Sequence, residues 1–170
     1  LHRIPKNPKK GEYYLTDVIE LATQAGLSVQ ATVMDDLEET IGINTRLHLS
    51  ECEAAMRRRI NQEHMLNGVT MIDPASTYIE AGVTIGQDTV VMPNTYLHGE
   101  TEIGERNVIG PNSIIRDTKI GNECKVLASV LEGARLEDGV DMGPFARLRK
   151  GAHLGNHVHM GNFGEGKDSY

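Results

Sequence analysis

The fold is decided by residues 79–115, which read IEAGVTIGQDTVVMPNTYLHGETEIGERNVIGPNSII. Aliphatic residues recur there at a step of six, and the same beat continues, with three steps of five, as far as Met160. A six-residue unit is too short for a helix with a return, but it fits one short strand and one sharp corner. We therefore predict triangular coils of three units each, stacked into a parallel β-helix. The predicted inward series is Ile79, Ile85, Val91, Leu97, Ile103, Ile109, Ile115, Ile120, Val126, Leu131, Leu136, Met142, Leu148, Leu154 and Met160.

The other positions of the repeat support the same geometry. Glycine often follows the aliphatic residue, and glycine or asparagine can take the positive φ angle that a sharp corner needs. The fourth residue after the aliphatic one is usually small or β-branched, as at Val83, Thr89, Thr95, Thr101, Ser113, Val130, Val140, Ala146, Ala152 and Val158. We expect the β-helix to span about Val69 to Phe163, with the aliphatic residues pointing inward throughout.

The first third of the chain has a different pattern. Tyr14 to Ala25 carries apolar residues at helical spacing, and Leu27 to Met34 alternates as a short strand does. Asp35 to Glu39 resembles one helical turn. Thr45 to Asn67 reads as a longer helix, polar on most of its surface and stopped by Gly68. This helix suits a connector between two domains.

Composition excludes several classes of protein. The chain has a net charge of −7 with scattered Lys and Arg, whereas nucleic-acid binding needs a concentrated basic face. No apolar stretch approaches the roughly 20 residues that span a bilayer, so we expect no membrane partner. Cys52 and Cys124 show neither metal-type nor redox spacing, which suits a reducing compartment. We predict a cytoplasmic protein.

The repeat resembles that of the hexapeptide transferases, which implies a left-handed coil and a homotrimer with acyl-donor sites between subunits. Five stretches narrow the resemblance: GEYYLTD at 11–17, GINTRL at 42–47, MRRRIN at 56–61, GVTMIDP at 68–74 and GPFARLR at 143–149. The five stretches occur in this order in one family, which the chain resembles from Gly11 to about Phe163. The family consists of the bacterial bifunctional enzymes with N-acetylglucosamine-1-phosphate uridyltransferase and glucosamine-1-phosphate N-acetyltransferase activities.

The resemblance implies a domain plan. Residues 1–46 would be the α/β C-terminal remnant of a uridyltransferase domain, residues 47–67 a linker helix, and residues 68–170 the N-terminal part of the acetyltransferase β-helix. The family's nucleotide-binding domain would precede this chain. Its histidine base would lie beyond Tyr170, so we expect no catalytic residue within the chain and no turnover by the chain alone.

The same resemblance implies three binding residues. Asn44 corresponds to a family asparagine that helps to hold Mg²⁺ and the sugar nucleotide, although from the residues alone a helix cap is the simpler reading. Arg149 corresponds to an arginine for the sugar phosphate, where the alternative is a solvated corner residue. Lys167 lies at the family's separation of eighteen residues from Arg149. Gly164 and Gly166 replace apolar residues of the family, so Lys167 is expected on a frayed end.

The histidines suggest a second chemistry. His157 and His159 share a strand face, which suits a metal, and His48 and His153 are also available. In the repeat register, however, the histidines of the β-helix fall at outward or corner positions. We favour a surface role for them.

The resemblance implies a fragment of an enzyme that makes UDP-N-acetylglucosamine. The substrates would be glucosamine 1-phosphate and acetyl-CoA for acetyl transfer, then N-acetylglucosamine 1-phosphate and UTP for uridyl transfer with Mg²⁺. Two alternatives stay open: another hexapeptide-repeat acyltransferase, or a catalytically inactive trimerisation module.

Overall fold

A computed structural model describes residues 4–170 and divides the chain into two compact units, one ending at Thr40 and the other running from Ile41 to Tyr170. The first unit contains helix α1 (Asp17–Gln24) and the 3₁₀-helix η1 (Leu37–Thr40). The strand predicted at Leu27 to Met34 is wrong, because these residues form no ladder and are exposed. A strand needs a hydrogen-bonded neighbour, and residues 4–40 supply none. Residues 4–40 therefore contain helices and loops but no strand.

Helix α1 buries no residue, although its pattern is amphipathic. Val18 and Ile19 of its predicted apolar stripe are exposed. Periodicity thus located the helix, but the described residues of this unit bury none of its side chains completely.

Helix α2 (Arg46–Leu66) opens the second unit, and its start corrects one interpretation of the sequence. Thr45 is the N-cap residue, because its side-chain oxygen accepts a hydrogen bond from the His48 amide at 3.2 Å. Asn44 precedes the cap, and only its backbone amide is used, donating to His48 Nδ1 at 3.3 Å. The capping role considered for Asn44 is therefore wrong.

The C-terminal half of α2 is docked on the first coil. Asn61 is buried, and its amide nitrogen donates to the carbonyl oxygens of Pro74 and Thr77, in and next to the 3₁₀-helix η2 (Pro74–Ser76). The Arg57 guanidinium lies 4.5 Å from the ring centroid of Tyr78. The helix and the coils are thus joined by side-chain contacts as well as by the chain.

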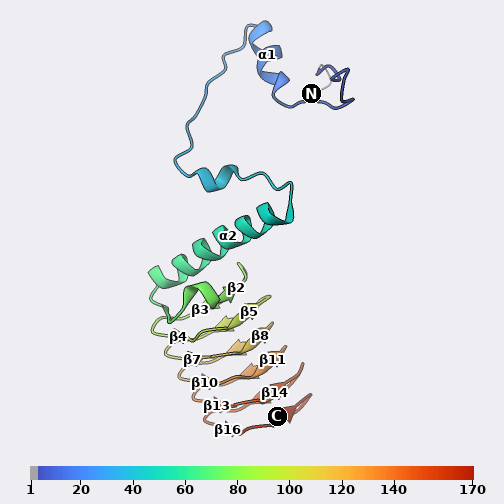
Figure 1. The fold of residues 1–170 in the computed structure, drawn as a ribbon. Coiled ribbons are helices and arrows are strands. Elements are labelled where there is room, and N and C mark those ends of the chain that lie inside the picture. Colours follow the sequence, from blue (N-terminus) through green and yellow to red (C-terminus); the bar gives the residue numbers. More distant parts are fainter. Residues whose placement is uncertain (1–3) are drawn as a thin grey trace. The chain divides into compact units, whose positions relative to one another are not determined.

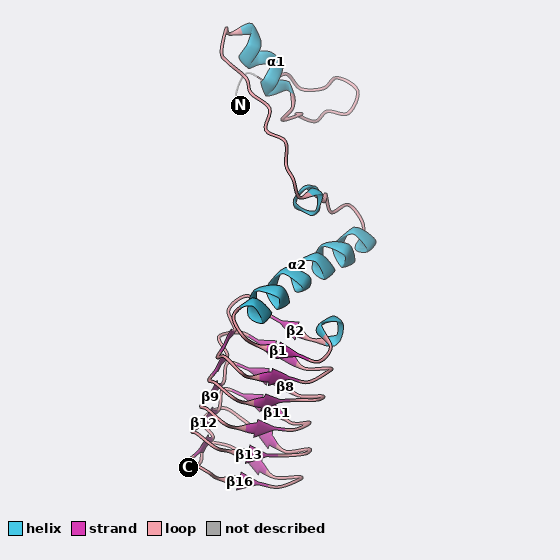
Figure 2. Ribbon diagram, turned by 90° about the vertical axis from the view of Figure 1, so that its left-hand side faces the viewer, coloured by secondary structure: helices cyan, strands magenta, loops and turns pink. Residues whose placement is uncertain are grey.

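Residues 70–166 form a solenoid of short parallel strands, seen as stacked rungs in Figure 1 and turned in Figure 2. This confirms the left-handed parallel β-helix. Successive strands visit three sheets in turn, so each sheet contains every third strand. Sheet A contains β1 (Thr70–Met71), β4 (Val90–Val91), β7 (Val108–Ile109), β10 (Lys125–Val126), β13 (Asp141–Met142) and β16 (His159–Met160). Sheet B contains β2 (Tyr78–Ile79), β5 (Tyr96–His98), β8 (Ile114–Arg116), β11 (Val130–Glu132), β14 (Arg147–Leu148) and β17 (Glu165–Gly166). Sheet C contains β3 (Thr84–Ile85), β6 (Glu102–Ile103), β9 (Lys119–Ile120), β12 (Arg135–Leu136) and β15 (His153–Leu154).

The aliphatic series forms the core, as predicted. Ile103 pairs with Ile85 on one side and Ile120 on the other, and the other sheets stack in the same way. Most members of the series are buried, while Ile85, Leu154 and Met160 pack against the core from partly buried positions. Each coil therefore adds one inward residue per sheet to a continuous apolar column.

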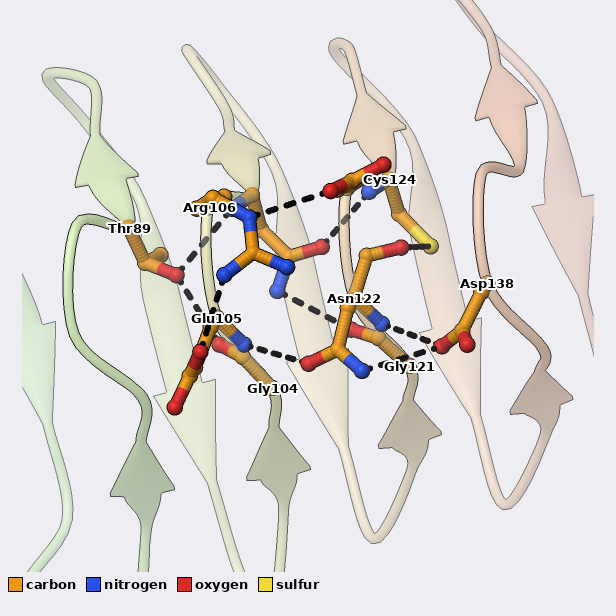
Figure 3. Close-up of polar contacts among 10 residues, drawn as sticks. Thr89, Gly104, Glu105, Arg106, Gly121, Asn122, Cys124 and Asp138 are labelled. Atoms are coloured by element: carbon orange, nitrogen blue, oxygen red, sulfur yellow. Dashed lines mark hydrogen bonds and ion pairs between the residues drawn. The ribbon is translucent and has the colours of Figure 1, made fainter.

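The corner between sheets C and A contains a buried polar ladder, drawn in Figure 3. The Thr89 hydroxyl donates to the Gly104 carbonyl at 2.9 Å and accepts from the Asn107 amide at 3.1 Å. The Asn107 side chain then donates to the Gly121 carbonyl at 3.0 Å and accepts from the Cys124 amide at 2.7 Å. Burial raises the pKa of the Cys124 thiol. The ladder satisfies amide groups that a corner would otherwise leave buried and unpaired.

Two details of the predicted register change. Val130 was named as the small or β-branched residue of its unit, but Ser129 is the buried residue there, because a five-residue step from Val126 to Leu131 shortens that unit by one residue. The strands also continue beyond Phe163, since β17 pairs Gly166 with Leu148. Gly166 leaves the inward position without a side chain, but the backbone ladder persists there.

Candidate functional site

Arg149 and Lys167 occupy the same corner, between sheets B and C, on two successive coils. Arg149 directly follows β14 and Lys167 directly follows β17. The paired strands place Leu148 beside Gly166, and the Arg149 amide donates to the Gly166 carbonyl at 2.9 Å. Neighbouring coils of a sheet lie about 4.8 Å apart. The separation of eighteen residues therefore corresponds to one complete coil, and the two cations are neighbours in space.

Both side chains are exposed and each lies near one carboxylate. Arg149 Nη1 is 3.5 Å from Glu165 Oε1, and Lys167 Nζ is 3.9 Å from Asp168 Oδ2. These are long, solvent-exposed contacts, which contribute little to stability and leave the cations available to a stronger anion. A guanidinium and an ammonium about one coil apart suit a phosphate group, which accepts several charge-assisted hydrogen bonds at once.

Asn44 lies in the loop before α2, far along the chain from that corner. Its side chain is exposed, and no hydrogen bond to its amide oxygen occurs within residues 4–170. An amide oxygen is a suitable Mg²⁺ ligand, but octahedral coordination requires several oxygen ligands. The part of the chain that the structure describes contains no group of three His, Cys, Asp or Glu side chains that could hold a metal ion. Asn44 could thus supply one oxygen ligand to Mg²⁺.

Two histidines predicted on the solenoid surface, His153 and His159, contact carboxylates of the preceding coil, whereas the His157 amide donates to the Asp138 carbonyl at 2.8 Å. His153 Nε2 is 2.7 Å from Glu137 Oε1, and His159 Nδ1 is 3.5 Å from Asp141 Oδ2. Hydrogen bonds from Arg135, and then from His153, lower the pKa of the Glu137 carboxyl. These pairs connect adjacent coils.

The solenoid surface is asymmetric, and one of its three edges is apolar. Within residues 69–170, large exposed apolar side chains lie on sheet A, on sheet B or at the corner between them, except Tyr170, whose ring packs against His153 of sheet C. The Phe145 and Phe163 rings stack at that corner with centroids 5.8 Å apart. We call this set the apolar edge: Ile72, Tyr96, Val108, Ile114, Leu127, Phe145 and Phe163.

No helix within residues 4–170 is long and apolar enough to cross a membrane.

The chain resembles several known proteins. Residues 82–117 match the family model described as bacterial transferase hexapeptide (six repeats). The bifunctional protein GlmU of Lactococcus lactis subsp. lactis is 52% identical over 99% of this chain, and that of Enterococcus faecalis is 46% identical over the same share. A solved hexapeptide transferase family protein from Anaplasma phagocytophilum is 18% identical and aligns with a TM-score of 0.41, covering 58% of this chain and 69% of its own.

The fold and the family model place the chain among proteins that contain the bacterial transferase hexapeptide repeat. Within that class the chain belongs to the family of the bifunctional GlmU proteins, as the resemblance of its motifs predicted. The chain spans 37% of the length of those relatives.

Proposed function

We propose that this chain is part of a bifunctional enzyme that makes UDP-N-acetylglucosamine. One observation carries the proposal: the similarity to the GlmU proteins extends over 99% of the chain, so it includes both the segment around Asn44 and the corner with Arg149 and Lys167. A different hexapeptide acyltransferase would not account for the matching residues that precede the solenoid.

In the proposed acetyl transfer, the amine of glucosamine 1-phosphate attacks the thioester carbonyl carbon of acetyl-CoA. A C–N bond forms, the C–S bond breaks, the coenzyme leaves as the thiolate, and a histidine base outside this chain takes the amine proton. Arg149 and Lys167 hold the sugar phosphate, so that their binding energy orients the amine toward the thioester.

In the proposed uridyl transfer, N-acetylglucosamine 1-phosphate reacts with UTP and releases pyrophosphate. Bound Mg²⁺ would neutralise charge on the phosphates. The contribution of this chain is Asn44, whose amide oxygen is one ligand for the ion or for the sugar nucleotide. The remaining ligands lie outside the chain.

We further propose that the boundaries at residues 46/47 and 67/68 separate the uridyltransferase remnant, the linker helix and the acetyltransferase domain.

We also propose a cytoplasmic homotrimer. The apolar edge supports the assembly, because an exposed apolar strip along one edge of a prism can be buried by identical edges around a symmetry axis. Sheet C and its two corners carry mostly charged and polar residues, so they suit solvent.

The two proposed activities can be separated in the complete protein. Arg149→Ala should reduce the efficiency of acetyl transfer by about 30-fold to 1000-fold, since a charge-assisted phosphate contact contributes about 2–4 kcal/mol. It should leave uridyl transfer unchanged, because the two sites share no contact. Thiol release and pyrophosphate release measure the two reactions.

Asn44→Ala is the matched variant and should give the mirror image: weaker uridyl transfer with a raised Mg²⁺ requirement, and normal acetylation. If Arg149→Ala retains full acetyl transfer, or loses both activities while still folded, the assignment of the phosphate site fails. If the 170-residue chain itself turns over either substrate pair well above background, the fragment interpretation fails.

A further inference from the structure

The corner that carries Arg149 and Lys167 contains a third cation, Lys150, to which sequence analysis assigned no role. Lys150 follows Arg149 directly, in the turn that leads into β15. Its carbonyl oxygen accepts from the Asp168 amide at 3.4 Å, so it faces the residue after Lys167 on the next coil. Three cationic residues of two coils therefore meet at one corner.

Lys150 differs from the other two cations in its surroundings. Arg149 and Lys167 each have a carboxylate within 4 Å, whereas no carboxylate lies that close to the Lys150 amine among the described residues. On the preceding coil the equivalent position is Gly133, whose Cβ, if present, would lie 3.3 Å from Lys150 Cγ. The Lys150 side chain is exposed, and the residue beside it on that coil has no side chain.

The local charge also departs from that of the whole chain. Residues 144–170 contain four Lys or Arg and two Asp or Glu, a surplus of two positive charges, in a chain with a net charge of −7. Two of these four cations lie within 4 Å of the segment's two carboxylates, and a third, Arg147, forms an ion pair with Glu132 of the preceding coil at 2.9 Å. Among the described residues Lys150 is thus the cation of this segment that no carboxylate pairs with, and its charge is available to a phosphate monoester, which carries nearly two negative charges at neutral pH.

We propose that Lys150 is a third phosphate-binding residue at this corner and contacts the phosphoryl group of the sugar phosphate. The inference rests on the proposed function, because that function places the phosphate between Arg149 and Lys167. Lysine is a flexible point charge, so Lys150 strengthens binding of the dianion without fixing its orientation, which the planar Arg149 guanidinium does.

The test is equilibrium binding of glucosamine 1-phosphate to the 170-residue chain, followed by the backbone amide signals of residues 149–151 and 166–168. Lys150→Gln should raise Kd about fivefold, and Lys150→Arg should restore most of the affinity. Lys125→Gln is the matched control. It removes the same charge from an exposed site on sheet A, the face opposite this corner, and should leave Kd unchanged.

The outcomes distinguish the inference from the function on which it rests. If Arg149→Ala abolishes binding and Lys150→Gln does not weaken it, the role of Lys150 is overturned and the phosphate site stands. Equal weakening by Lys125→Gln overturns it too, because net charge alone would then explain the effect. If Lys150→Gln weakens binding of coenzyme A and not of glucosamine 1-phosphate, Lys150 contacts a phosphate of the coenzyme, and its proposed contact with the sugar phosphate is overturned. If the native chain shows no saturable binding, both the site and the role of Lys150 are overturned.

Discussion

Single residues in this protein act mainly through their position in a column of equivalent residues. Asn107 is buried and polar, yet its side chain has partners on the neighbouring coil. It donates to the Gly121 carbonyl and accepts from the Cys124 amide. The Asn122 side chain makes comparable contacts outside the core, where its Oδ1 accepts from the Glu105 amide at 2.8 Å and its Nδ2 donates to Asp138 Oδ1 at 3.3 Å. Figure 3 shows the inner and outer ladders side by side.

Asn107→Ala should destabilise the protein by about 2–3 kcal/mol, because the buried Cys124 amide and Gly121 carbonyl lose their partner and water cannot replace it. Asn122→Ala, on the solvated side of the same corner, should cost under about 1 kcal/mol. Urea unfolding of both variants measures the difference. Equal losses would contradict the view that burial makes the inner ladder more important.

At the scale of the element, ion pairs and hydrogen bonds between coils reinforce the backbone ladders. Glu80 Oε2 accepts from the Gly99 amide and Glu80 Oε1 lies 2.9 Å from His98 Nδ1, so one carboxylate joins the first two coils. The Gly99 hydrogen bond, followed by the one from His98, lowers the pKa of the Glu80 carboxyl. Because the folded state prefers the ionised form, Glu80 stabilises the fold above the unfolded pKa of about 4.3, and this contribution is lost as the pH falls through the folded pKa.

Glu80→Gln should therefore lower the thermal midpoint at pH 7, and the gap from the native chain should close as the pH falls below about 4. Glu100→Gln removes a carboxylate from the same corner without that hydrogen bond, and it should shift the midpoint less at every pH. Thermal unfolding followed by circular dichroism from pH 3 to 8 measures both. Parallel curves for Glu80→Gln and the native chain would refute the assignment.

At the scale of the whole molecule, the solenoid has one apolar edge and polar surfaces elsewhere. In a single chain such a strip would be exposed to water, whereas assembly through it would bury aromatic and aliphatic area. Ile114 lies at the centre of the sheet B side of the apolar edge and is 44% exposed. It is therefore a suitable position at which to test the proposed trimer.

Ile114→Asp should dissociate the complete protein into single chains, because a carboxylate at a closed interface loses its hydration without gaining a partner. Thr84→Asp, an exposed change on sheet C, should leave the assembly intact. Sedimentation equilibrium distinguishes the two, with the native protein expected at three times the mass of one chain. A native protein that sediments as a single chain would remove the trimer from the proposed function.

The sequence by itself determined the repeat, the inward series, the long helix and the family. These signals are local and periodic, and each inward aliphatic residue is needed wherever the chain folds into coils. The resemblance to the family also indicated the separation of eighteen residues between Arg149 and Lys167, which the structure shows to be one coil. Their roles as binding residues, like that of Asn44, remain predictions.

Only the tertiary structure decided the features that depend on neighbouring coils or on missing neighbours. The alternating pattern at Leu27 to Met34 did not become a strand, since strands require a partner that periodicity cannot supply. The burial of Ser129 in its shortened unit, and the polar ladder through Asn107, arise from the register between coils. The surroundings of Lys150 also depend on the stacking of the coils. Gly133 lies seventeen residues before Lys150 and Asp168 eighteen residues after it, and both become its neighbours only when the coils stack.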